Sequence, residues 1–287
     1  MAGNLDESGP VRLEGLCGGP EPGAGRIRIG PAAPGIERAA AHLRGRAFAP
    51  HRHDTYAIGL TLSGAQTFTY RGARRHCLPG QVHVLHPDEV HDGAAGTEEG
   101  FGYHIAYVDP ALIQGALGGR PLPFVADPVV SGPWPGGPLA ALWRIDEPVG
   151  EAERVEAVAA LADGLLRLSG SGDGPHRALR LAALTRVRDL IAADPAAPVR
   201  AERLEREAGL DRWALARGFR AAFGTSPSGF RTMRQLDRAR ALIRQGAALA
   251  EAALAAGFAD QSHLSRHFKR AYGITPARWA ALTRAPR

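Results

Sequence analysis

Residues 256–279, AGFADQSHLSRHFKRAYGITPARW, are the stretch from which the rest of the chain is interpreted. Apolar residues recur in it every four positions and therefore share one face of a helix: Leu264, Phe268 and Tyr272. Gly257 stands where a tight turn favours a positive φ, and Asp260 stands where a helix is capped. The stretch predicts a turn followed by the second helix of a helix-turn-helix motif.

The face of this helix opposite the apolar residues is polar and basic. A solvated amphipathic helix would explain the charge, but not the turn glycine together with the capping residue. Arginine donates two parallel hydrogen bonds to guanine, glutamine pairs with adenine in the same way, and other cations reach phosphates. The residues predicted to contact DNA here are Gln261, Ser262, His263, Ser265, Arg266, Lys269 and Arg270, the last two through phosphates.

An earlier stretch repeats this pattern. Residues 204–230 align with residues 252–279, at an offset of 48 residues before the turn and 49 after it. Between the two copies, residues 227–244 have the apolar period of a connecting helix. Two such units can place their second helices in two successive major-groove segments of DNA, about 34 Å apart. A-form RNA is a poorer partner, because its major groove is closed to side chains. In the first unit the residues predicted to contact DNA are Arg212, Trp213, Ala216, Arg217 and Arg220.

Charge is distributed unevenly along the 287 residues. Residues 1–174 hold 14 Lys+Arg against 20 Asp+Glu, a net charge of −6, whereas residues 175–287 hold 21 against 9, a net charge of +12. A compact basic segment attracts a polyanion, because phosphate attraction is the sequence-independent part of nucleic-acid binding. The charge therefore supports a nucleic acid as the partner of the C-terminal part.

Residues 36–108 show short apolar runs separated by Gly and Pro. The runs at 56–62, 66–70 and 81–86 are typical of strands. Turns are marked at Ser63-Gly64, Arg71-Gly72 and Leu78-Pro79-Gly80. A turn about every ten residues favours an all-β domain over alternating strands and helices. We expect a small antiparallel barrel or sandwich.

Histidine is unusually frequent in this β region, and three of its histidines have the spacing of metal ligands. His51 and His53 lie two residues apart in an extended segment, so both project to one side, and His91 stands on a later strand. The segment resembles the cupin barrel, in which matching histidines hold a metal together with a carboxylate or glutamine. Here Ala57 and Ile58 stand where that fourth ligand is expected. Two interpretations stay open: a divalent metal on three imidazoles, or a small-molecule pocket lined by His51, His53, Tyr56, His91 and Tyr103.

Composition sets the domain boundaries. Residues 1–25, rich in Gly, Pro and acidic side chains, are predicted to be a disordered tail. Residues 26–168 are predicted to form one domain, in which the β region is followed by a helical stretch at 151–168 that serves packing or dimerisation. Residues 169–175 are a linker, and residues 176–287 form the DNA-binding domain.

Neither secretion nor membrane insertion is indicated by the sequence. Two cysteines are too few for a disulfide scaffold and fit a reducing compartment. The first residues lack a signal-peptide pattern, and no apolar run approaches eighteen residues. We expect a cytoplasmic protein with no membrane partner.

The stretch GFADQSHLSRHFKRAYGITP, residues 257–276, resembles the signature of the AraC family of bacterial transcription regulators, and the resemblance covers about residues 177–283. It implies an α+β chain of two domains: a cupin-like antiparallel β-barrel with trailing helices, and an all-α domain with two helix-turn-helix units joined by a linker helix. It also implies double-stranded promoter DNA, RNA polymerase and a small-molecule effector as partners, often activation, and commonly a homodimer. One departure is Glu205, where the family usually has alanine; the second unit keeps Ala253.

The leading hypothesis is a sequence-specific DNA-binding transcription regulator, not an enzyme, whose activity depends on a small molecule in the β domain. No cofactor is expected unless the histidines hold a metal. The alternative is a metal-dependent cupin enzyme fused to a DNA-binding domain. Little supports it, because no nucleophile turn and no Gly-rich phosphate loop is present.

Overall fold

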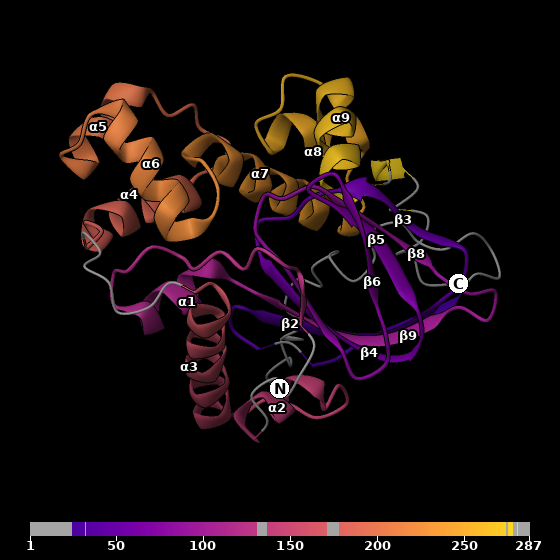
Figure 1. Cartoon of the computed structure of the whole chain (residues 1–287). Coiled ribbons are helices and arrows are strands. Elements are labelled where there is room, and N and C mark those ends of the chain that lie inside the picture. Colours follow the sequence, from indigo (N-terminus) through magenta and orange to yellow (C-terminus); the bar gives the residue numbers. More distant parts are fainter. Residues whose placement is uncertain are drawn as a thin grey trace, which may run out of the picture.

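The computed structural model describes residues 25–31, 33–130, 137–170, 178–273, 275–277 and 280. The predicted tail, apart from residue 25, and residues 171–175 of the predicted linker lie outside these ranges. An N-terminal part built on strands packs beside a C-terminal part built on helices, which confirms the α+β class (Figure 1). None of the helices in the described ranges has the length and apolar character needed to cross a membrane.

The strands form two antiparallel sheets that share one core. One sheet has six strands in the order β1-β2-β9-β4-β7-β10, and the other has four in the order β3-β8-β5-β6. The bounds are β1 Gly25–Ile29, β2 Ile36–Leu43, β3 Arg46–His51, β4 Tyr56–Gly64, β5 Gln66–Tyr70, β6 Ala73–Cys77, β7 Val82–Leu85, β8 His91–Ala95, β9 Phe101–Val108 and β10 Val129–Val130. Phe48 and Phe68 of the smaller sheet and Leu43 of the larger one belong to the same apolar cluster. The cupin-like domain is therefore an open two-sheet form, not a closed barrel.

Turn residues fix how neighbouring strands pair. Arg71 and Gly72 have φ values of 50° and 79°, the two positive angles that a two-residue type I′ hairpin requires. This turn sets Tyr70 opposite Ala73 between β5 and β6. Gly80 also has a positive φ, so the turns predicted at Arg71-Gly72 and Leu78-Pro79-Gly80 are confirmed. The turn predicted at Ser63-Gly64 is wrong, because both residues belong to the end of β4 and pair with β9, although Gly64 has a positive φ.

Helices cover one side of the β domain. They are α1 (Pro110–Leu117), the short 3-10 helix η2 (Gly137–Leu139), α2 (Ala140–Trp143) and α3 (Glu151–Leu168). Asp109 caps α1 by accepting a hydrogen bond from the Ala111 backbone N–H at 2.8 Å. Val158, Leu161 and Leu165 of α3 are buried in a cluster with residues of α1 and of the larger sheet. The structure thus supports the packing role predicted for α3, whose dimerisation role stays a prediction.

The C-terminal part follows the predicted repeat. Its helices are α4 (Leu181–Ala193), α5 (Ala201–Ala208), α6 (Arg212–Phe223), α7 (Pro227–Arg244), α8 (Leu249–Ala255) and α9 (Gln261–Tyr272). Helices α5 and α6 form the first helix-turn-helix unit, α8 and α9 form the second, and α7 joins them (Figure 1). Ser226 caps α7 and Pro227 starts it, which is the favoured order for a helix N-terminus.

The two helix-turn-helix units relate differently to the β domain. Leu236, Phe258 and Phe268, from α7 and the second unit, belong to the same apolar cluster as Phe48 and Phe68 of the β domain. The core of the first unit, which includes Leu215, Phe219 and Phe230, is a separate cluster. Apolar burial therefore joins the second unit to the sensor domain more closely than the first.

Candidate nucleic-acid interface and interdomain pocket

Both helix-turn-helix units turn at a glycine in the left-handed region. Gly209 has φ +60° and Gly257 has φ +84°, values that side chains other than glycine rarely adopt. A Cβ on Gly257 would also lie 2.6 Å from the Ala196 Cα, which is backbone and has little room to move. The second turn therefore requires glycine for two independent reasons.

Side-chain caps start both recognition helices. Asp211 accepts hydrogen bonds from the backbone N–H groups of Trp213 and Ala214, and these bonds lower the pKa of its carboxyl group. Asp260 accepts one from the His263 N–H at 2.7 Å. The capping role predicted for Asp260 is confirmed, and the first unit uses the same device.

On α6 the residues predicted to contact DNA all lie on the exposed face. The Trp213 side chain is 70% exposed, although indole is one of the larger apolar groups of the chain. This exposure leaves the ring free for the predicted contact with a thymine methyl group or a deoxyribose, which stays a prediction. The exposed set is Arg212, Trp213, Ala216, Arg217 and Arg220.

On α9 the predicted residues divide into two groups. The exposed ones are Gln261, Ser262, Arg266, Lys269 and Arg270, while Ser265 and His263 are half-buried. The ring of His263 packs against Phe258 and His267, and its Nδ1 accepts the Ala259 backbone N–H. The imidazole ring of His263, which was predicted to face DNA, therefore stabilises the turn of the second unit instead of lying fully exposed.

Glu205 points at the first recognition helix. Its carboxylate lies 3.1 Å from Nε of Arg212, and its side chain is only 24% exposed. The unusual glutamate therefore turns aside from the helix crossing and pairs with a residue predicted to contact DNA. Sequence reasoning identified the departure at Glu205 but not its partner.

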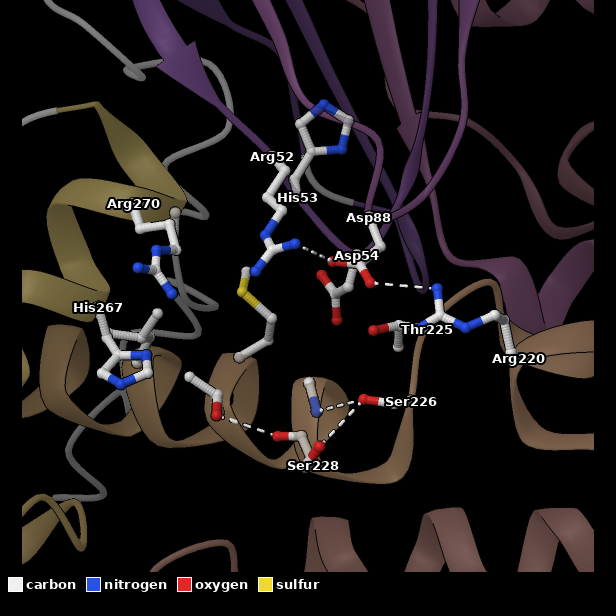
Figure 2. A pocket seen from close by; sticks show the side chains of 15 residues that line it. Arg52, His53, Asp54, Asp88, Arg220, Thr225, Ser226, Ser228, His267 and Arg270 are labelled. Atoms are coloured by element: carbon white, nitrogen blue, oxygen red, sulfur yellow. Dashed lines mark hydrogen bonds and ion pairs between the residues drawn. The ribbon is translucent and has the colours of Figure 1, made fainter. Parts of the chain in front are cut away.

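A cavity of about 440 Å³ lies between the β domain and the helices (Figure 2). Arg52, Asp54 and Asp88 reach it from the β domain, while Arg220 and Arg270 reach it from α6 and α9. Asp88 holds both Arg52, at 3.3 Å, and Arg220, at 3.5 Å. Arg270 forms no ion pair with any residue that the structure describes. Two arginines predicted to contact DNA thus also line the interdomain pocket.

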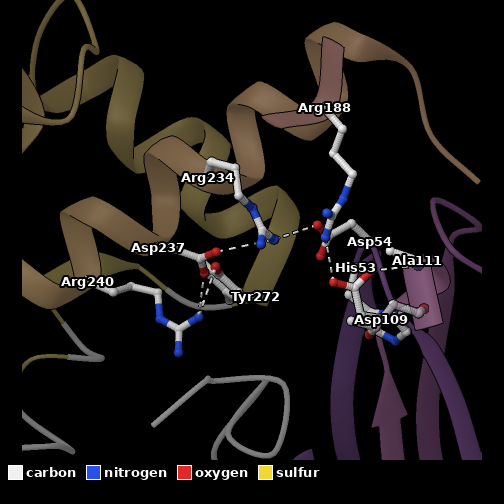
Figure 3. A network of polar contacts seen from close by, with 10 residues as sticks. His53, Asp54, Asp109, Ala111, Arg188, Arg234, Asp237, Arg240 and Tyr272 are labelled. Carbon is white, nitrogen blue, oxygen red and sulfur yellow. Dashed lines mark hydrogen bonds and ion pairs between the residues drawn. The ribbon is translucent and has the colours of Figure 1, made fainter. Parts of the chain in front are cut away.

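Further ion pairs also cross between the domains (Figure 3). Arg188 of α4 lies 2.9 Å from Asp109, the residue that caps α1. Arg234 of α7 lies 2.6 Å from Asp54 and 3.2 Å from Asp237. The chain of contacts continues from Asp237 to Arg240 and then to the Tyr272 hydroxyl of α9, with 3.2 Å at each step. The two pairs that cross between the domains, Arg188–Asp109 and Arg234–Asp54, have no local sequence signal, because their partners are far apart in the chain.

The three histidines with ligand-like spacing meet inside the β domain. His51 and His91 face each other across β3 and β8, with ring centres 4.4 Å apart, and His53 lies 4.8 Å from His91. Burial lowers the pKa of all three, that of His53 to about 3. One ring nitrogen of each lies within 4.8 Å of the others, a group able to hold a metal ion.

The other predicted pocket residues have different surroundings. Tyr56 is buried and its hydroxyl donates to the Pro123 carbonyl at 3.3 Å. Tyr103 is buried in the shared core next to Phe101. His53 alone of the predicted ligand-binding set lines the interdomain cavity. The effector role of Tyr56 and Tyr103 stays a prediction.

Comparisons with known proteins match both parts of the chain. The model of the AraC-like ligand binding domain matches residues 33–191, and that of a helix-turn-helix domain matches residues 204–281. A 1.65 Å structure of ToxT from Vibrio cholerae is similar over 90% of this chain and 98% of its own, with 11% identity and a TM-score of 0.57. A structure of ToxT from Vibrio cholerae O395 is similar over 88% and 100%, with 11% identity and a TM-score of 0.58. Comparison with curated proteins gives no match.

Proposed function

The chain belongs to the AraC family of DNA-binding transcription regulators, and we propose that α6 and α9 bind promoter DNA under the control of an anionic small molecule held between the domains. The pair of capped recognition helices on one connecting helix carries this proposal. Each helix buries its apolar face and exposes polar and basic side chains. Such helices enter a major groove with their N-terminal residues toward the bases.

The chemistry of the interdomain cavity supports an anionic effector. Arg52, Arg220 and Arg270 bring three guanidinium groups to its wall, and a guanidinium binds a carboxylate through two parallel hydrogen bonds. Met233 and Leu236 add apolar surface on the same wall. Solved structures of ToxT contain an unsaturated fatty acid or (E)-4-(8-methylnaphthalen-1-yl)but-3-enoic acid, both carboxylic acids. We infer a carboxylate with an apolar body as the effector of this chain.

Competition for the arginines would link the effector to DNA. Asp88 forms an ion pair with Arg220. A carboxylate bound beside Arg270 would compete with Asp88 for the guanidinium of Arg220. An effector changes activity only through different affinities for two arrangements of the domains. Arg220 belongs to the recognition helix and to the pocket wall, so it is the residue through which the two arrangements would differ.

Family membership favours a regulator over the alternative of a metal-dependent enzyme. The family resemblance adds further parts to the proposal. These are RNA polymerase as a partner, activation of transcription, a homodimer and a cytoplasmic location. The effector is proposed to change how the homodimer binds the promoter.

Genome-wide footprinting of the protein, followed by titration of the recovered sites, tests the proposal. We expect a consensus with two half-sites about one helical turn apart, and affinity that changes at least threefold when a long-chain carboxylate is added. Arg270→Ala should weaken binding to all DNA sequences modestly, as the loss of one phosphate contact does, and should lose the response to the carboxylate. Binding without sequence preference would contradict the DNA part, and an unchanged response of Arg270→Ala would contradict the effector site.

A further inference from the structure

Three buried histidines converge where the smaller sheet begins. His51, the last residue of β3, and His91, the first of β8, are direct partners across the two strands. His53 follows two residues after His51 and packs edge-on against the His91 ring. Their exposed fractions are only 6%, 3% and 4% for His51, His53 and His91. One ring nitrogen from each lies within 4.8 Å of the other two.

The hydrogen bonds of the three rings fix which nitrogen carries the proton. In each histidine Nδ1 lies 2.8 or 2.9 Å from a backbone carbonyl two residues away, the partners being Ala49, Thr55 and Glu89. A carbonyl oxygen only accepts, so each Nδ1 is the N–H donor and each Nε2 keeps its lone pair. Metal-binding histidines show this arrangement, in which a carbonyl orients the ring and leaves the other nitrogen free to bind.

A purely structural role explains these rings less well. A core histidine is satisfied when both nitrogens have partners, yet no described residue donates a hydrogen bond to any of the three Nε2 atoms. Three lone pairs gathered this closely repel one another, and none of them has a hydrogen-bond donor among the described residues. A cation at their centre would remove both costs at once.

We propose that His51, His53 and His91 bind one divalent transition-metal ion through their Nε2 atoms. An all-imidazole set suits Zn²⁺, Fe²⁺, Ni²⁺ or Cu²⁺, whereas Mg²⁺ and Ca²⁺ need oxygen ligands. Tetrahedral bonds of about 2.1 Å would place the nitrogens about 3.4 Å apart, so the rings need to close by only about 1.4 Å from their widest separation. Three protein ligands leave at least one position for water or an exogenous ligand.

The position of the histidines gives such an ion a second effect. His53 precedes Asp54, which pairs with Arg234, and His91 lies three residues after Asp88, which pairs with Arg220. A bound ion would hold together the two β-domain segments that contact the helical domain through these carboxylates. This inference is independent of the proposed effector.

Metal titration of the tag-free, full-length protein tests the site. After removal of metals with a chelator, we expect Zn²⁺ and Co²⁺ to bind at about one ion per chain and Mg²⁺ not to bind. Saturating Zn²⁺ should raise the unfolding temperature by about 5 °C, because an ion that binds only the folded state stabilises it. A wild-type protein that binds no Zn²⁺ and shows no such shift would overturn the proposal without any variant.

Variants locate the ion on the three histidines. His51→Ala and His91→Ala should each weaken Zn²⁺ binding at least about tenfold and remove the rise in unfolding temperature. His76→Ala is the matched control, since His76 is exposed on β6 and outside the cluster. Equal Zn²⁺ affinity in wild type and His51→Ala would overturn the site, as would a loss in His76→Ala as large as that in His51→Ala.

Discussion

Asp54 and Arg234 stand 180 residues apart in the chain, and their side chains meet at 2.6 Å across the boundary between the domains. Both are largely buried, with side chains 8% and 18% exposed. A carboxylate so poorly hydrated depends on its partner, because removal of either charge leaves the other in a low-dielectric site. This ion pair is therefore one of the contacts that hold the helical domain on the β domain, together with Arg188–Asp109 and Arg220–Asp88.

Asp54→Asn should loosen the contact between the domains. Arg234 keeps Asp237 at 3.2 Å as a second partner, so the expected loss of unfolding free energy is about 1 to 3 kcal/mol. Urea unfolding and limited proteolysis measure it. Asp146→Asn is the control, because Asp146 and its partner Arg28 are 65% and 60% exposed and should contribute less than about 1 kcal/mol. Equal losses in the two variants would argue against an anchoring role for Asp54.

Glu205→Ala should strengthen DNA binding by the first helix-turn-helix unit. The change frees Arg212, which the glutamate now holds at 3.1 Å, and removes a negative charge beside the DNA face. We expect affinity to rise by about two- to tenfold, with stability changed by less than about 1 kcal/mol because Arg212 is 61% exposed. Fluorescence anisotropy at fixed salt measures the affinity.

Glu202→Ala provides the comparison for Glu205. It removes the same charge from an exposed position on the same helix, and among the described residues its side chain forms no ion pair with the recognition helix. If both variants bind DNA equally well, only net charge matters and the pairing with Arg212 has no separate effect.

Arg266→Ala should weaken binding and relax base preference at one position of the operator by about 1 to 3 kcal/mol. Arg266 is exposed in the middle of α9, on the polar face opposite the buried Leu264 and Phe268. Lys269→Ala is expected instead to weaken binding to all DNA sequences alike and to reduce the salt dependence of the binding affinity. Selection of binding sites from a random library distinguishes these outcomes, and a uniform loss for Arg266→Ala would make Arg266 a phosphate contact.

The β domain should lose stability in acid through His86. Burial lowers the pKa of His86 to about 4, and its Nε2 accepts the Val125 backbone N–H at 3.0 Å, which requires the neutral ring. The folded pKa lies below the ordinary value of 6.5, so the unfolded chain takes up the proton first. The stabilisation is therefore complete above about pH 6.5 and is lost as the pH falls toward 4, on the order of 3 kcal/mol.

His86→Gln isolates this effect, because the amide oxygen can accept the Val125 N–H but does not titrate. The variant should be less stable than wild type at pH 7, where it lacks the ring contacts with Phe124 and Tyr56. The difference in unfolding free energy between wild type and variant should narrow as the pH falls. Unfolding curves at pH 7, 6, 5 and 4 measure it. A constant difference would mean that His86 does not titrate in this range.

Local patterns in the sequence predicted much of the helical domain correctly. The connecting helix was expected over 227–244 and is α7, Pro227–Arg244, because proline, a capping serine and an apolar period all act within a few residues. Short edge strands such as β1 and β10 were not predicted. Their pairing partners, β2 and β7, lie outside the local window, and a strand of few residues has little periodicity of its own.

The sequence by itself determined the two helix-turn-helix units, since the turn glycines Gly209 and Gly257 and the caps act on neighbouring backbone. The tertiary structure decided which side chains these units share with the β domain. It turned Glu205 to Arg212, brought Asp88 to Arg220, and gathered three histidines from separate segments. Such contacts form between residues distant in the chain, and their energy depends on packing and desolvation, which no short stretch of sequence specifies.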